Sequence, residues 1–243
     1  MSVRIDRPEK RNAIDLDMYR CMAAALAAAD ADPGVRVILF EGSGGNFTSG
    51  NDLADFRDPS ALDAGSPVFR FIEALESAGK PLVAAVEGLA IGIGVTMLLH
   101  FDLVYAGEGS RFQLPFVSLG LCPEAGSSQL LPQAAGYRRA AELFLLGEPF
   151  DAAAARGSGI VNEVVSTGQA GQVAREKAQR IAAQPAAAVR LTKELLRRGN
   201  RETLDTTIRL ETERFRERLL SPEAAEAFAA FAARRAPDFS RFP

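Results

Sequence analysis

The chain has 243 residues and is 47% hydrophobic, which is enough to bury a large core and lies near the upper limit of one domain. Its formal net charge of −3 arises from interspersed charges rather than blocks, which argues against a nucleic-acid-binding stripe and against a basic membrane surface. Cys21 and Cys122 are the only cysteines, and no apolar run has signal-peptide or membrane-span length, so we expect a cytoplasmic protein without a disulfide framework.

The first half of the chain alternates helix-like and strand-like segments. After Asp15, which can serve as an N-cap, apolar residues recur at helical spacing and predict a helix that closes at residues 32–34. Short apolar runs predict buried strands at residues 35–40, 82–86 and 103–105, with Phe112 in a further extended piece and helices at residues 68–77 and 94–99. The alternation predicts an α/β core.

Beyond Gly126 the composition shifts towards alanine and charge, which favours helices. Helices are predicted at residues 138–146, 151–156, 169–183, 186–197 and 202–219 and from Ser221 onward, and the last strand at residues 161–165. The final helices carry apolar faces that need a partner surface, either the core or another subunit. We therefore predict a core at residues 1–185 and a C-terminal helical region at residues 186–243.

Two glycine-punctuated turns and one carboxylate could carry chemistry. The turns FTSGND (residues 47–52) and AIGIG (residues 90–94) each follow a strand-like run, and PEAGSS places Glu124 in a third turn. Two backbone N–H donors and one acid suffice for proton transfer beside a polarised carbonyl. Taken singly, each glycine turn also fits a plain strand-to-helix connection, and Glu124 after Pro123 fits a first-turn helix acid.

Five motifs together resemble one family. RPEKRNAI, FTSGNDL, GLAIGIG, FDLVYA and PEAGSS occur in the order and spacing of the crotonase (enoyl-CoA hydratase/isomerase) superfamily, and the match covers nearly the whole chain. The SGND turn, the threonine-bearing helix and the PEA turn are most similar to the peroxisomal-type Δ3,Δ2-enoyl-CoA isomerases. The resemblance implies an α/β fold, a crotonase-like spiral of ββα units, with a helical C-terminal trimerisation region that forms homotrimers or dimers of trimers.

The resemblance also implies the roles of the site residues. In the family, one backbone N–H from each glycine turn forms an oxyanion hole for the thioester oxygen, and the matching positions are Asn51 and Ile93. The position that matches the general base is Glu124, which would carry a proton between C2 and C4 of an acyl-CoA substrate and so move a double bond from C3 to C2. This chemistry needs no metal or redox cofactor, because coenzyme A is part of the substrate.

Two departures separate this chain from the hydratases of the same family. Hydratases add water with two glutamates, and the matching positions here are Thr96 and Phe116, neither of which can deprotonate water in that role. The difference favours an isomerase. Thr96 is expected to hydrogen-bond the ligand or Glu124, or else a carbonyl one turn earlier in its helix.

The resemblance places the CoA part of the substrate along the first glycine turn. Ser49, Asp52 and Leu53, together with Asn51, would contact adenine and pantetheine, and Lys10 and Arg11 would lie near phosphate, although the two cations also fit plain solvated charges. Asp52 is in addition expected to cap a short helix, LADF. The first strand is cut short, which puts its edge pairing in question.

Other chemistries find little support in the sequence. His100 is the only histidine and follows two leucines on a mostly apolar helix, so we expect a packed, hydrogen-bonded side chain rather than a metal or triad centre. Two alternatives stay open: another CoA-thioester activity of the same fold, such as a hydratase, and a non-catalytic acyl-CoA-binding scaffold that assembles through its helical tail.

Overall fold

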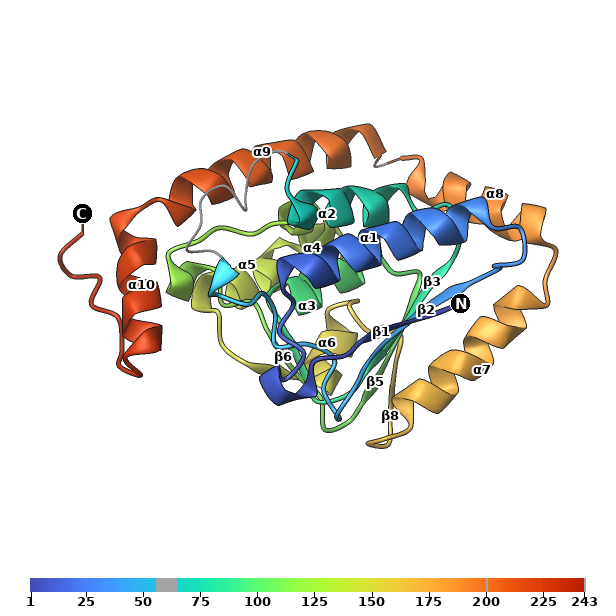
Figure 1. Cartoon of the computed structure of the whole chain (residues 1–243), viewed down its shortest axis with the longest axis horizontal. Coiled ribbons are helices and arrows are strands. Elements are labelled where there is room, and N and C mark those ends of the chain that lie inside the picture. Colours follow the sequence, from blue (N-terminus) through green and yellow to red (C-terminus); the bar gives the residue numbers. More distant parts are fainter. Residues whose placement is uncertain (56–64, 200, 243) are drawn as a thin grey trace.

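A five-stranded parallel sheet forms the centre of the molecule. The computed structural model describes residues 1–55, 65–199 and 201–242 and is drawn in Figure 1. The strands lie in the order β1, β2, β3, β5, β8, and each pair of neighbours runs parallel. Their bounds are β1 (Ser2–Ile5), β2 (Ile38–Gly42), β3 (Leu82–Val86), β5 (Leu103–Gly107) and β8 (Glu163–Val165). The short β1 pairs with β2 along its whole length, so the edge pairing that its brevity put in question is formed.

Helices cover both faces of this sheet because successive strand residues point to opposite sides. Ile38 and Phe40 of β2 join the larger core cluster with α1 (Leu16–Ala31) and α2 (Pro67–Ser77), which lie side by side in Figure 1. Leu39 faces the other way, into a second cluster with α7 (Ala170–Ala182). The central strand β3 is therefore buried along its whole length, and most of β2 and β5 is buried too, as the continuous apolar runs predict.

A smaller sheet lies beside the first and carries the second glycine turn. It consists of β4 (Leu89–Ile91), β6 (Arg111–Gln113) and β7 (Phe150–Asp151), with β4 parallel to β6 and β6 antiparallel to β7. The chain enters β4 directly from β3, so consecutive strands contribute to different sheets.

Side-chain caps fix the starts of several helices. Asp15, Ser66, Asp151 and Ser221 each accept a hydrogen bond from the backbone N–H three residues later. The remaining helices are η1 (Pro8–Lys10), α3 (Ile93–Thr96), η4 (Met97–His100), η5 (Val117–Leu119), α4 (Ser127–Ala135), α5 (Tyr137–Leu146), α6 (Ala152–Gly157), α8 (Ala186–Arg197), α9 (Arg201–Leu219) and α10 (Pro222–Ala232).

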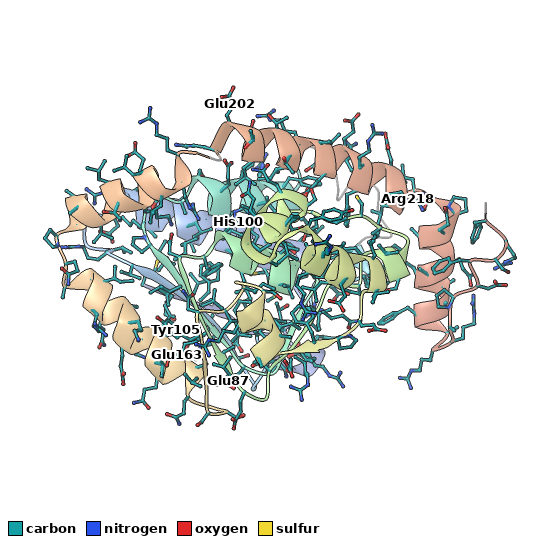
Figure 2. The ribbon with its side chains drawn as sticks, turned by 180° about the vertical axis from the view of Figure 1, so that it is seen from behind. Glu87, His100, Tyr105, Glu163, Glu202 and Arg218 are labelled. Carbon is teal, nitrogen blue, oxygen red and sulfur yellow. The ribbon has the colours of Figure 1, made fainter. Side chains whose placement is uncertain are left out.

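The last helices wrap the outside of the molecule. α9 runs across it between Glu202 and Arg218 in Figure 2 and packs on α4, and α10 packs on η5 near the C-terminus. α8 has an unusual orientation, because Lys193 is its buried residue whereas Leu191, Leu195 and Leu196 are exposed. The predicted division after residue 185 falls between α7 and α8.

Apart from LADF, the helix predictions are confirmed, although residues 94–99 are divided between α3 and the 3-10 helix η4, and two strand starts were wrong. β2 begins at Ile38 rather than Val35, because the α1-to-β2 connection keeps Val35 in a turn bonded to Asp32. β8 begins at Glu163, since the Asn162 side chain bonds the main chain of β5 before the ladder starts. The predicted helix LADF extends to Phe56, outside the described residues. Leu53 and Ala54 form a turn, and Asp55 has 3-10 helical conformation. Within the described ranges, every helix is too short or too polar to cross a lipid bilayer.

Candidate active site

The two glycine turns meet at the junction of the two sheets. Thr48 donates its N–H to Leu89 O at 2.8 Å and accepts from Ile91 N at 3.1 Å. Gly50 has φ of +92°, and a Cβ atom there would stand 2.8 Å from Ile91 O. Glycine is therefore required at this position both for the backbone angle and for the close approach of the two main chains.

This contact leaves one N–H of each turn free for a ligand. The neighbouring amides are used, since Gly92 N donates to Gln113 O at 2.9 Å and Asp52 N donates to Ile14 O at 2.9 Å. The N–H groups of Asn51 and Ile93 have no protein acceptor within the described ranges 1–55, 65–199 and 201–242. Both residues line a cavity of about 820 Å³. Two unpaired donors at one cavity wall suit an oxygen that gains negative charge.

A tyrosine from the first helix holds the first turn, which the sequence analysis did not anticipate. The Tyr19 hydroxyl donates to Asn51 Oδ1, and its buried ring packs on Phe71 with the ring centroids 5.5 Å apart. Burial and the nearby charge of Glu124 raise the pKa of Tyr19 well above its usual value, so the hydroxyl stays a neutral donor. A tyrosine on the apolar face of a predicted helix is itself a signal, because a buried hydroxyl usually has a partner.

Glu124 is a buried acid with one side-chain donor. It is 3% exposed, and Thr96 Oγ1 donates to its Oε1. Burial raises the pKa of Glu124 to about 8, against the Thr96 hydrogen bond, which lowers the pKa, and with the charge of Glu211, which raises it further. An acid with this pKa can take up and return a proton near neutral pH. Of the possibilities open for Thr96, the bond to Glu124 is the one formed.

The turn that carries Glu124 has a left-handed backbone at two successive residues. Ala125 has φ of 59° and Gly126 has φ of 71°. His100 holds this turn through its Nε2, which lies 2.7 Å from Ala125 O. Burial lowers the pKa of His100 to about 4, so the ring is neutral at pH 7 and Nε2–H donates to the carbonyl. The prediction of a packed, hydrogen-bonded histidine is confirmed.

The cavity collects the residues assigned to CoA from the resemblance. The members of that set on its wall are Lys10, Arg11, Ser49, Asp52 and Leu53. Thr96 does not line the cavity. It lies three residues beyond Ile93, buried against Glu124. The C-terminal helices contribute Phe215, Phe228 and Phe231 to the wall, so part of their predicted apolar faces lines the cavity.

Asp52 has a structural role whatever it binds. Its carboxylate accepts from Arg7 at 2.7 Å and from Ala54 N, two residues later, at 3.1 Å. The second bond is an Asx turn and is also one that a helix N-cap makes, while the predicted helix itself runs beyond the described residues. Partial burial would raise the pKa of Asp52, but the Arg7 and Ala54 hydrogen bonds outweigh it, so the pKa lies below its usual value. Ser49 Oγ donates to Lys10 O at 3.2 Å, which keeps the exposed Lys10 beside the first turn.

The two positions that hold glutamates in hydratases have other environments here. Phe116 is 4% exposed and packs on Phe144 at a centroid distance of 6.2 Å, and it lines the cavity with its ring. Thr96 is fully buried and its hydroxyl is used by Glu124. Glu124 itself is not among the residues that line the cavity. It is linked to the two turns through Thr96, which donates to it from the helix that begins at Ile93, and through Tyr19, which feels its charge and donates to Asn51.

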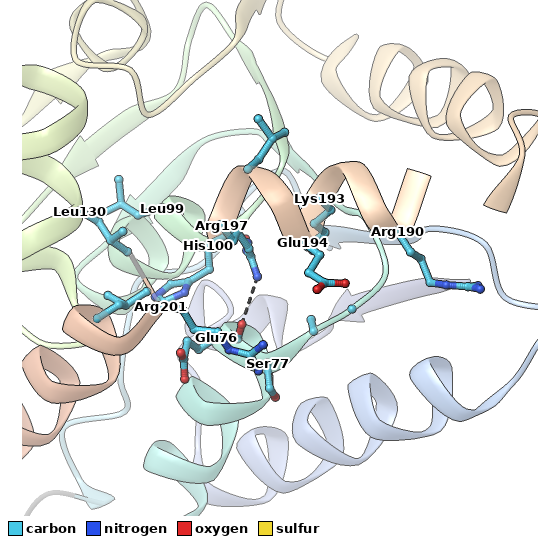
Figure 3. A pocket seen from close by; sticks show the side chains of 14 residues that line it. Glu76, Ser77, Leu99, His100, Leu130, Arg190, Lys193, Glu194, Arg197 and Arg201 are labelled. Atoms are coloured by element: carbon cyan, nitrogen blue, oxygen red, sulfur yellow. Dashed lines mark hydrogen bonds between the residues drawn. The ribbon is translucent and has the colours of Figure 1, made fainter. Parts of the chain in front are cut away.

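A second cavity, of about 400 Å³, lies between α2, η4 and α8 and is shown in Figure 3. Its buried cations already have protein partners. Lys193 Nζ donates to Asp102 at 2.8 Å and to Lys80 O at 2.7 Å, and Arg197 donates to Glu76 O at 3.1 Å and to His100 O. None of the glycine-turn residues line it, so we take the 820 Å³ cavity as the active-site candidate.

The chain is similar to known proteins over nearly its whole length. The family model described as enoyl-CoA hydratase/isomerase matches residues 1–241. The 1,2-epoxyphenylacetyl-CoA isomerase of Escherichia coli is 34% identical over 99% of this chain and 94% of its own length. Enoyl-CoA delta isomerase 2 of Rattus norvegicus is 36% identical over 96% of this chain, which spans 61% of that longer protein. The solved structure of an enoyl-CoA hydratase/isomerase from Pseudoalteromonas atlantica superposes with a TM-score of 0.93 at 39% identity, covering 98% of this chain and 95% of that one.

Proposed function

The chain belongs to the enoyl-CoA hydratase/isomerase family, and we propose that within it the chain is a Δ3,Δ2-enoyl-CoA isomerase. The substrate is a 3-enoyl-CoA thioester, and the product is the conjugated 2-enoyl-CoA. The observation that carries the proposal is the combination of one buried acid, Glu124, with the unpaired N–H groups of Asn51 and Ile93.

The reaction uses one carboxylate twice. The thioester oxygen accepts hydrogen bonds from the N–H groups of Asn51 and Ile93, which stabilise the negative charge that grows as C2 loses its proton. Ionised Glu124 takes that proton, and the electron pair of the C2–H bond becomes part of a dienolate that spans C2 to C4. Glu124 then gives the same proton to C4, the double bond settles between C2 and C3, and the carboxylate is regenerated.

The pKa of about 8 on Glu124 suits both halves of this cycle. A more acidic carboxylate would be a weak base towards C2, whereas the protonated form must readily give its proton to C4. At pH 7 about one tenth of the free enzyme carries the ionised base, since one pKa unit corresponds to a factor of 10. The rate is therefore expected to rise with pH through about 8.

The surroundings of Glu124 support isomerisation over hydration. Hydration of a 2-enoyl thioester needs groups that position and deprotonate a water molecule, and the hydratase positions hold Thr96 and Phe116 here. The Thr96 hydroxyl already donates to Glu124, and Phe116 gives the cavity wall an apolar surface that binds no water.

The central experiment is Glu124→Gln, which keeps the shape of the side chain and removes the base. Turnover of a 3-enoyl-CoA, followed by absorbance of the conjugated thioester, should fall by about 10²- to 10⁴-fold while acyl-CoA binding is retained. The matched control is Glu108→Gln, an exposed acid in a turn between strands. Near-normal turnover in Glu124→Gln would refute the assignment.

Two assays on the wild-type protein separate the alternatives. Rapid hydration of crotonyl-CoA would favour a hydratase of the same fold. Tight binding of a CoA ester with no turnover on any enoyl substrate would favour the non-catalytic scaffold.

We further propose that the protein assembles as a homotrimer or a dimer of trimers. The exposed leucines of α8, Leu191, Leu195 and Leu196, form an apolar face that a monomer would leave in water. Sedimentation equilibrium should give three or six chains, and a monomer at micromolar concentration would refute the proposal.

A further inference from the structure

The turn that carries Glu124 depends on a side chain from the C-terminal helical region. The turn contains two left-handed residues, Ala125 and Gly126, and α4 begins directly after it. A left-handed conformation is unfavourable for alanine, so the surrounding structure must hold it in place. Gly126 is the N-cap of α4 and has no side chain that could accept from the first N–H groups of this helix.

Glu211 of α9 supplies that acceptor across 85 residues of sequence. Its Oε2 accepts from Gly126 N at 2.6 Å, and its Oε1 accepts from Ser128 N at 2.8 Å. The side chain is 7% exposed, and burial raises the pKa of Glu211, whereas hydrogen bonding to the Ser128 side chain and to the two main-chain N–H groups lowers it and favours the charged form. A bidentate carboxylate on two N–H groups fixes both the position and the orientation of the turn.

The packing of α9 on the turn is equally close. A Cβ atom on Gly126 would lie 2.4 Å from Leu204 and 3.1 Å from Ile208. These two residues precede Glu211 on one face of α9, at helical spacing. The side chains of α9 therefore pack directly against the backbone of the turn and leave no free space between them.

The same carboxylate acts on the base electrostatically. Glu211 raises the pKa of Glu124, because a second negative charge nearby disfavours ionisation of the first. Thr96 and Tyr19 face Glu124 from the other elements, and the thiol of Cys122, whose pKa is raised to about 11 mainly by burial, is the further titratable group beside both acids. Arg218 of α9, the cation that acts on the Cys122 thiol, is engaged with Gly120 O at 3.0 Å and Glu223 at 3.0 Å.

We propose that Glu211 is a positioning residue for the reaction: its two carboxylate oxygens fix the turn that carries Glu124 through the N–H groups of Gly126 and Ser128. This inference rests on the proposed function, in which Glu124 moves the proton. It makes the C-terminal helical region a functional part of the active site as well as a possible assembly surface.

A helix cap without this role would behave differently. A cap needs only an acceptor oxygen, which glutamine also provides, whereas the proposal requires the second oxygen and the negative charge. The test is therefore Glu211→Gln, with Glu213→Gln as the matched control, because Glu213 is an exposed acid on the same helix.

In Glu211→Gln, kcat on a 3-enoyl-CoA at the pH optimum should fall about tenfold with KM changed less than twofold, since the turn is displaced and substrate binding is not. The acid limb of the pH profile should move to lower pH by about half a unit or more, because the like charge is gone. Glu211→Asp keeps the negative charge but shortens the side chain by one methylene group. Its kcat should therefore fall, while the acid limb of its pH profile should move less than in Glu211→Gln. The control should match wild type in both.

A second readout does not depend on activity. The carbonyl stretch of protonated Glu124, identified by its loss in Glu124→Gln, can be titrated by infrared difference spectroscopy in the free protein. Its midpoint should fall in Glu211→Gln. An unmoved midpoint and an unchanged kcat in Glu211→Gln, whatever the change in thermal stability, would overturn the inference.

The two proposals can fail separately. If no 3-enoyl-CoA is turned over by wild type, the proposed function fails, and the infrared titration still decides whether Glu211 controls Glu124. If Glu211→Gln does not fold, Glu211→Asp decides by the same two readouts, and wild-type values there would overturn the inference.

Discussion

The buried acid at residue 124 makes a prediction about stability that needs no substrate. In the unfolded chain this glutamate ionises near its ordinary pKa of 4.5, whereas burial raises the value to about 8 in the folded protein. Each pKa unit corresponds to about 1.4 kcal/mol, so the difference amounts to at most about 5 kcal/mol of unfolding free energy.

The sign follows from which state holds the proton more tightly. Between pH 4.5 and 8 the folded protein keeps Glu124 protonated while the unfolded chain releases the proton, so the folded state binds more protons. The stabilisation is fully present below the lower pKa and is lost as pH rises through the higher one. Glu124→Gln removes this titration and preserves the shape of the side chain.

Urea unfolding of wild type and Glu124→Gln from pH 5 to pH 9 tests the argument. The unfolding free energy of the variant relative to wild type should increase by several kcal/mol between these limits, with most of the change above pH 6. Because both proteins share every other ionisable group, the difference isolates Glu124. Two parallel curves would show that Glu124 ionises at its ordinary pKa in the folded protein and would refute the burial argument.

Three further substitutions test other parts of the site. Thr96→Val removes a hydrogen bond that lowers the pKa of Glu124, so the acid limb of the rate profile should move to higher pH, opposite to Glu211→Gln, and the rate at pH 7 should fall by about threefold to tenfold; an unmoved limb would contradict the assignment of Thr96. Replacing Lys10 and Arg11 together by glutamine should raise KM for a CoA ester roughly tenfold while leaving kcat unchanged, and a pantetheine thioester without phosphates, as the control substrate, should not distinguish the proteins. Gly50→Ala should lower the unfolding free energy by about 1–3 kcal/mol in urea titrations, because Gly50 has φ of +92° and its added Cβ atom would lie 2.8 Å from Ile91 O. Gly199→Ala, in open space, serves as the neutral control, and equal effects of the two substitutions would refute the close contact.

The local features of the fold and site could be predicted from sequence because their causes are local. Capping residues such as Asp15 and Ser221 mark helix starts, because each bonds a backbone N–H only three residues later. A tight turn that requires glycine likewise contains that glycine in its own sequence. The helix α4 carries no such local signal and is not predicted, because its N-cap Gly126 has no capping side chain and Pro132 interrupts its helical pattern. β4 and β7 are too short, at three and two residues, to show alternation.

The second layer of the site could not be predicted because it depends on tertiary contacts. Tyr19 and Asn51 are 32 residues apart, and Glu211 and Gly126 are 85 apart. Glu211 stands in a helix rich in charged residues, where nothing in the local pattern separates a buried acid from the solvated ones around it. Its partners are backbone N–H groups, which have no identity in the sequence.

The hydrogen bonds from Glu211 of α9 to the Glu124 turn have a consequence for the order in which the site can form during synthesis. Both glycine turns, Glu124 and every named strand precede residues 201–219 in the chain, so the two hydrogen bonds from Glu211 to the turn can form only after α9 has been synthesised. Under the proposed function, a chain that ends before residue 201 lacks both hydrogen bonds from Glu211 and should therefore turn over substrate more slowly than the full chain.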